Sequence, residues 1–194
     1  MSGSGQHRSA APLAVRAHPL VLGTVLFLAS EAMFFAALFA AYFDLRANRA
    51  AWPPPGTHSD LLSSGIGTAA LAAASLVMIF ATRAMDRRRW LAARLWTASA
   101  ILAATIFVGI ALAGYARDPF TVATNAYGSI YYTITGFHLL HVLVGIAVLA
   151  SILVGMRSPA LRAAHRAGAE AMMYYWHFVF IVWIGIWTTV DVIR

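Results

Sequence analysis

Long apolar stretches separated by short polar segments set the pattern of this 194-residue chain. A helix needs roughly 20 apolar residues to cross a hydrocarbon core of about 30 Å. The short alternating segments typical of transmembrane strands are not found. The pattern therefore predicts an all-α fold, an integral membrane bundle of five transmembrane helices. The predicted spans run approximately from Leu20 to Tyr42, Leu61 to Ala84, Ala92 to Ala116, Ser129 to Met156 and Met172 to Ile193.

Composition supports the membrane assignment. Hydrophobic residues make up 61% of the chain and charged residues only 11%, and the mean hydropathy is +0.73, far from the average of soluble proteins. The loops are short, so residues 19–194 are expected to form one transmembrane domain. Residues 1–18 are expected to be a flexible cytoplasmic tail, because they lack the separate apolar segment of a signal peptide.

The arginines are distributed unevenly between the two sides of this topology. All 14 basic residues are arginine, and ten of them fall in the tail and in the two loops on its side of the membrane. The positive-inside rule then predicts a cytoplasmic N-terminus and an outer C-terminus. The net charge of +7 is explained by topology and lipid contact, and no nucleic-acid partner is expected.

The chain contains no cysteine. This excludes disulfides, thiolate metal sites, iron-sulfur clusters and covalently attached c-type haem. Any cofactor would have to be held by histidine, methionine or carboxylate ligands, and none is expected in this chain.

Glu31 is the most informative single residue, because it lies about 17 Å along the first span. An ionisable group at such a depth is costly and needs a partner. His138 and His141 lie one turn apart on the fourth span, about 14 to 18 Å below its outer end, which is the depth of Glu31. We expect a buried polar pair of Glu31 with a histidine, and we favour His141 over His138.

The sequence supports a metal site less well than it supports this polar pair. Imidazole and carboxylate ligands from Glu31, His138 and His141 suit several divalent ions. A histidine that simply satisfies the buried carboxylate is nevertheless the usual arrangement inside a membrane bundle. His177 lies at a different level and does not match either histidine as a second haem ligand. We therefore predict no metal site and no catalytic residue in this chain.

Several motifs occur in order along nearly the whole chain. They are Phe27 to Phe35, Trp52 to Pro54, Pro119 to Thr121, Ala126 to Ser129, Gly136 to Val142, Tyr175 to Val179, and Trp183. Together these motifs resemble subunit III of cytochrome c oxidase. The resemblance is specific because it extends over nearly the whole chain in the right order, and five spans fit the short bacterial form of the family.

The resemblance implies an accessory subunit without a redox centre, in the proton-pumping haem-copper terminal oxidase of aerobic respiration. Such a subunit would lie in the bacterial plasma membrane beside subunits I and II, which would carry the haems and copper. It would support proton uptake, oxygen access and stability of the catalytic subunit through bound phospholipid. The family also implies a carbodiimide-reactive glutamate at Glu31.

Lipid head groups would be met by Arg157, Arg162 and His165 near the inner leaflet. Each of these residues is equally well explained as a snorkelling side chain or a topology charge. The chain departs from the family pattern at Phe180, where an aspartate is usual, at Leu139, where glycine is common, and at Asp118, where glutamate is common.

Other functions stay open at the level of the sequence. The chain could be the related subunit of a quinol oxidase, or the subunit III-like component of a nitric oxide reductase. It could also be a stand-alone proton or ion conductor that uses Glu31, His138 and His141 as a relay. Such a conductor needs a polar path on both sides of the midplane, and the spans offer few polar candidates for it.

Overall fold

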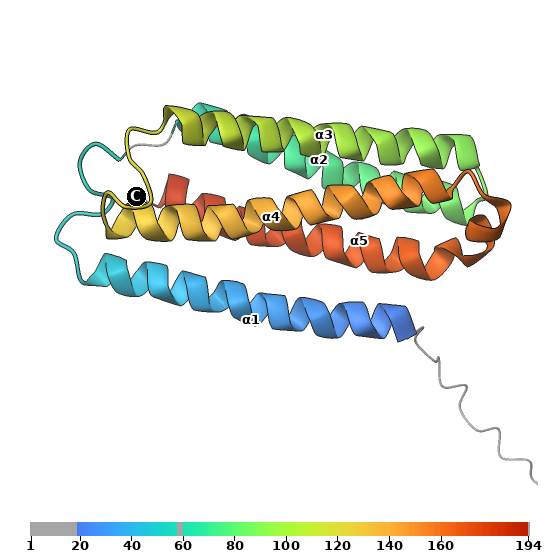
Figure 1. Cartoon of the computed structure of the whole chain (residues 1–194), viewed down its shortest axis with the longest axis horizontal. Coiled ribbons are helices and arrows are strands. Elements are labelled where there is room, and N and C mark those ends of the chain that lie inside the picture. The colour runs from blue at the N-terminus through green and yellow to red at the C-terminus, as the bar shows by residue number, and fades with distance from the viewer. Residues whose placement is uncertain (1–18, 58–59, 194) are drawn as a thin grey trace, which may run out of the picture.

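The computed structural model describes residues 19–57 and 60–193, and of residues 160–166 only the backbone. No strand occurs among the described residues, and all five helices are long and apolar enough to span a membrane. The predicted all-α bundle of five spans is confirmed, whereas its orientation stays a prediction. The helices are α1 (Pro19–Ala47), α2 (Leu61–Asp86), α3 (Trp90–Arg117), α4 (Ala126–Gly155) and α5 (Pro159–Trp187), and a π-helical turn, η1 (Thr188–Val192), follows α5 (Figure 1).

Polar side chains define where helices begin. The Asp60 side chain accepts a hydrogen bond from the Leu62 amide and caps α2. Asn125 accepts one from the Gly128 amide and caps α4. Such caps satisfy amide groups that have no partner inside the helix.

The fifth helix begins at Pro159, well before the predicted start of its span at Met172. An apolar run indicates only the part of a helix that crosses the membrane, so it does not predict a polar extension of that helix.

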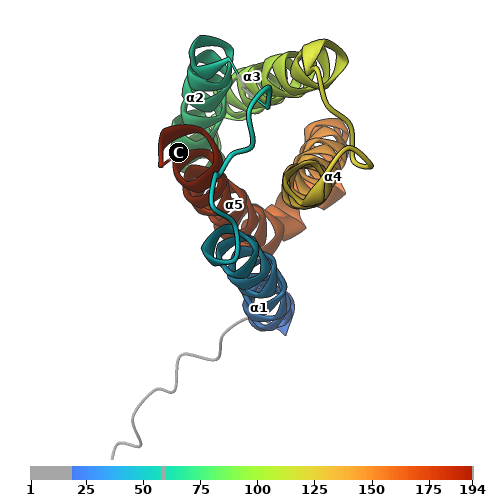
Figure 2. The ribbon, with the colours of Figure 1, turned by 90° about the vertical axis from the view of Figure 1, so that its left-hand side faces the viewer.

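Helices α2, α3, α4 and α5 form a ring, and α1 lies outside it against α4 and α5 (Figure 2). The α2–α3 pair is the most extensive contact. Five alanines of these two helices are completely buried, and small residues allow membrane helices to approach closely. These are Ala74 and Ala81 on α2 with Ala93, Ala100 and Ala104 on α3.

Helix α1 is hydrogen-bonded to the segment after α5, which contains η1, at the end of the bundle where α1, α3 and α5 finish. We call this the C-terminal end. The Tyr42 hydroxyl donates to the Thr189 carbonyl at 2.9 Å, and Arg46 donates to the Ile193 carbonyl at 2.9 Å. Elsewhere α1 is loosely covered, and Met33 is 75% exposed in the isolated chain. One face of α1 is therefore free for lipid or another protein.

Candidate functional site

Glu31 of α1 and His141 of α4 lie in contact. The carboxylate Oε2 is 3.0 Å from the imidazole Nε2. The side chains are 21% and 13% exposed, respectively, so the pair is partly open at the seam between α1 and α4. The structure thus brings together two residues that are far apart in the sequence.

Hydrogen-bond geometry limits how many protons this pair holds. His141 Nδ1 lies 2.7 Å from the Phe137 carbonyl oxygen, and a carbonyl only accepts, so Nδ1 carries a proton. Nε2 then either donates to the carboxylate or accepts a proton from a carboxylic acid on Glu31. Both arrangements contain one shared proton, and in both the pair has no net charge.

Two further contacts hold the histidine of this pair. The Phe35 ring meets the His141 ring edge to face, with centroids 5.2 Å apart. The Tyr175 hydroxyl of α5 donates to the His141 carbonyl at 2.8 Å. The pair is therefore built at the junction of α1, α4 and α5, with its ring orientation set by α4 itself.

His138 does not join this pair. Its Nε2 lies 3.1 Å from the Val179 carbonyl of α5, and the side chain is 1% exposed. The Phe107 and Trp183 rings flank it, with centroids at 5.9 and 4.9 Å. Three residues along a helix leave two side chains only about 60° apart around the axis, so the two histidines leave neighbouring faces of α4. His138 reaches the Val179 carbonyl inside the ring, whereas His141 reaches Glu31 of α1.

His177, the third histidine within the spans, forms a hydrogen bond inside its own helix, because its Nδ1 lies 2.9 Å from the Met173 carbonyl oxygen. Within the described part of the chain, no three His, Asp or Glu side chains gather in a group that would ligate a metal ion. Within the considered set, Glu31 contacts His141, whereas His138 bonds to the Val179 carbonyl.

An apolar groove of about 340 Å³ lies between α1, α4 and α5. It adjoins the pair, because Tyr175 lines it and Phe27 lies one turn before Glu31. Arg157, at the end of α4, is exposed; the side chains of Arg162 and His165 lie outside the described residues. The groove is lined by Leu20, Phe27, Val144, Val148, Ile152, Gly168, Ala171, Met172 and Tyr175.

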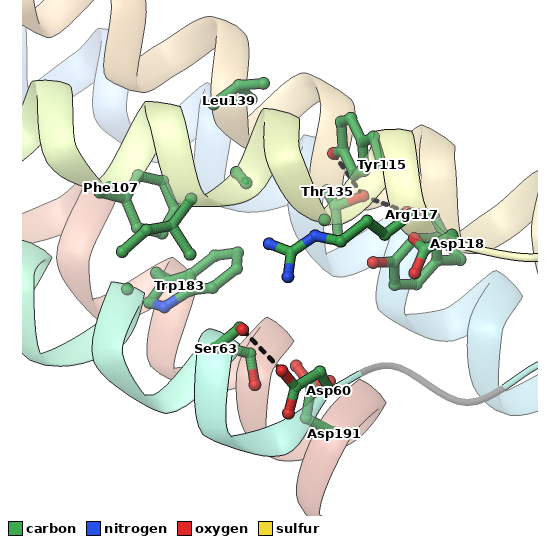
Figure 3. Close-up of a pocket in the computed structure, with 16 residues that line it drawn as sticks. Asp60, Ser63, Phe107, Tyr115, Arg117, Asp118, Thr135, Leu139, Trp183 and Asp191 are labelled. Atoms are coloured by element: carbon green, nitrogen blue, oxygen red, sulfur yellow. Dashed lines mark hydrogen bonds between the residues drawn. The ribbon is translucent and has the colours of Figure 1, made fainter.

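A second cavity, which our sequence reasoning missed, lies inside the ring near the C-terminal end (Figure 3). Asp60, Arg117, Asp118 and Asp191 line it together with aromatic side chains. The signal was present in the sequence, because these charges stand at the ends of three different spans that the topology brings to one side of the membrane.

The carboxyls of this cavity differ in their electrostatics. Hydrogen bonds from the Ser63 hydroxyl and the Leu62 amide hold the pKa of Asp60 below its ordinary value. Burial raises the pKa of Asp118, and its Oδ2 has no hydrogen-bond partner among the described residues. Asp60 therefore holds its negative charge more firmly than Asp118 does.

The fold and the Glu31–His141 pair define a multi-pass membrane protein with a carboxylate–imidazole contact between two of its spans. The family model described as Cytochrome c oxidase subunit III matches residues 3–192. The chain therefore belongs to the cytochrome c oxidase subunit III family.

Named relatives agree with the family match. The chain is 34% identical over 183 residues to a probable cytochrome c oxidase subunit 3 of Nocardia farcinica, covering 92% of this chain and 90% of the relative. It is 33% identical over 207 aligned positions to the cytochrome c oxidase subunit 3 of Corynebacterium diphtheriae, covering 100% and 99%. The corresponding protein of Thermostichus vulcanus is 33% identical over 169 residues, covering 87% and 84%.

Proposed function

We propose that this chain is an accessory subunit without a redox centre in a haem-copper terminal oxidase. It binds beside subunit I and subunit II, which carry the haems and copper, in a bacterial plasma membrane. Family membership supports a complex with other oxidase subunits. Within that complex the chain supports proton uptake, oxygen access and stability of the catalytic subunit through bound phospholipid.

The observation that carries this proposal is the apolar groove beside the Glu31–His141 pair. At the C-terminal end, Tyr42 and Arg46 of α1 bond to the segment that follows α5. Toward its N-terminus, helix α1 lines a groove with α4 and α5. Apolar walls at the level of the hydrocarbon core suit an acyl chain, which would cover the partly open polar pair.

The head group of this lipid would lie near the end of α4. Arg157 is exposed there, five residues beyond the groove residue Ile152. A guanidinium near the membrane surface attracts anionic head groups. Arg162 and His165 remain part of the proposal as further head-group ligands.

Filling the groove tests the lipid proposal. In Val148→Trp the indole would occupy the groove. Val154→Trp is a matched control, since Val154 is also an exposed valine of α4 and does not line the groove. We expect the assembled oxidase with Val148→Trp to lose bound phospholipid in native mass spectrometry and to inactivate faster during turnover. Equal lipid content and equal lifetime in the two variants would contradict the proposal.

The electron donor is tested separately. The complex that copurifies with this chain should show haem absorption and oxidise reduced cytochrome c. Oxidation of quinol in its place would assign the chain to the related quinol oxidase, and conductance of the isolated chain in liposomes would favour an ion conductor.

Phe180, which stands where the family usually has aspartate, is half-buried and packs against the core.

A further inference from the structure

The cavity at the C-terminal end of the ring has a volume of about 180 Å³. A water molecule needs only about 10 to 15 Å³ of such space, so the cavity has room for a ligand of several heavy atoms. Its walls include the rings of Phe107, Tyr115, Tyr131 and Trp183. Aromatic faces attract cations.

Charge also favours a cationic ligand. Three carboxylic side chains line the cavity, at Asp60, Asp118 and Asp191, against a single cationic side chain, Arg117. They come from the start of α2, the end of α3 and the turn after α5. A cleft lined mainly by one sign of charge concentrates the opposite ion.

Arg117 already places a cation in this cavity. Its Nε donates to the Ala113 carbonyl at 2.9 Å. The terminal nitrogens make no hydrogen bond or ion pair with the described residues. Figure 3 shows the side chain extending into the cavity toward Trp183. A guanidinium therefore lies among aromatic rings and carboxyls without being locked to any of them.

We propose that this cavity binds small organic cations, either amines or guanidinium compounds, and that Arg117 is a tethered competitor which leaves the cavity when such a ligand enters. Asp60 supplies the firm negative charge, and the rings of Phe107 and Trp183 receive the cation. This proposal is independent of the proposed oxidase function. The cavity lies inside the ring, whereas the Glu31–His141 pair and the apolar groove lie between α1 and the ring.

If Arg117 competes with the ligand for the cavity, removing the Arg117 side-chain charge should raise the affinity of the cavity for an organic cation. The full chain in lipid nanodiscs is titrated calorimetrically with methylguanidinium chloride, with sodium chloride as the reference salt. We expect Arg117→Gln to bind methylguanidinium about tenfold more tightly than the unmodified chain. Arg49→Gln is the matched control, since Arg49 is exposed and does not line the cavity.

A second variant tests the carboxylate. In Asp60→Asn the charge is lost, whereas asparagine still caps α2, so the helix is expected to persist in circular dichroism. We expect methylguanidinium binding to weaken at least tenfold when this change is added to Arg117→Gln.

Three outcomes would overturn the proposal. The first is that Arg117→Gln binds no more tightly than the unmodified chain or Arg49→Gln. The second is that adding Asp60→Asn leaves the affinity unchanged. The third is that sodium produces the same heat as methylguanidinium, which would show general screening by salt and no cation site.

Discussion

The imidazole of His141 on α4 lies 3.0 Å from the carboxylate of Glu31 on α1, and its other nitrogen donates to the Phe137 carbonyl. This arrangement requires one proton between the two side chains, whichever atom carries it. The pair is therefore neutral as a unit. A neutral pair lowers the cost of placing an ionisable residue among apolar spans, because no net charge has to leave water.

The first prediction concerns the partner of this histidine. In Glu31→Gln the amide N–H can still donate to His141 Nε2, so the free energy of unfolding should change little. In Glu31→Leu the nitrogen loses its partner, which should cost about 1 to 3 kcal/mol. Unfolding of the chain in mixed micelles measures the difference. Equal losses in the two variants would show that the hydrogen bond contributes nothing.

A second prediction concerns the other half of the pair. In His141→Phe the Glu31 carboxylate has lost its partner, and an ionised carboxylate is costly in apolar surroundings. We expect Glu31 to be protonated at neutral pH in this variant. Infrared spectroscopy should show the C=O stretch of a carboxylic acid. The same band must vanish when Glu31→Gln is added, and its absence from the single variant would contradict the prediction.

A third prediction addresses the packing of α4 on α5. A Cβ placed on Gly145 would lie 2.5 Å from the Trp176 ring, and Trp176 is fully buried. Gly145→Ala should therefore force a shift and lower the free energy of unfolding by about 1 to 3 kcal/mol. Gly109→Ala is the control, because nothing lies within 4 Å of the added Cβ. Equal stability of the two variants in the same unfolding assay would refute the close contact.

The fourth prediction is a pH dependence at the start of α2. The pKa of Asp60 is lowered in the folded chain by hydrogen bonds from Ser63 and Leu62. Its carboxylate therefore stabilises the fold fully above the unfolded pKa of about 3.9, and this contribution is lost as the pH falls through the lower folded pKa.

Asp60→Asn keeps a cap but cannot titrate. The difference in unfolding free energy between the unmodified chain and this variant should be constant near neutral pH and should change below about pH 4. Proton titration of the Asp60 carboxyl by NMR gives an independent reading of its pKa. A midpoint at or above the ordinary aspartate value would be inconsistent with the cap.

Much of the fold could be predicted because a membrane span reveals itself locally. An apolar run of sufficient length is readable wherever it occurs, since backbone groups in lipid must be satisfied inside one helix. The start of α5 at Pro159 could not be read in this way. Its first turns are polar, and a helix that leaves the hydrocarbon core no longer needs an apolar run.

The candidate sites were predictable only in part. The depth of Glu31 and of the histidines follows from counting residues along spans, and this narrowed the partners to His138 and His141. Which face of α4 meets α1 depends on how the helices are arranged around one another. The apolar groove and the acidic cavity likewise depend on helices that are distant in the chain.

The sequence by itself determined the class of this protein: five spans, a single carboxylate at mid-depth, no cysteine, and membership of a recognisable family. Only the tertiary structure decided that His141 contacts Glu31, that His138 faces the ring interior, and that Arg117 extends into a cavity with three carboxyls. The physical reason is that hydrophobicity acts on each segment separately, whereas contacts between segments depend on the rotation and packing of every helix in the bundle.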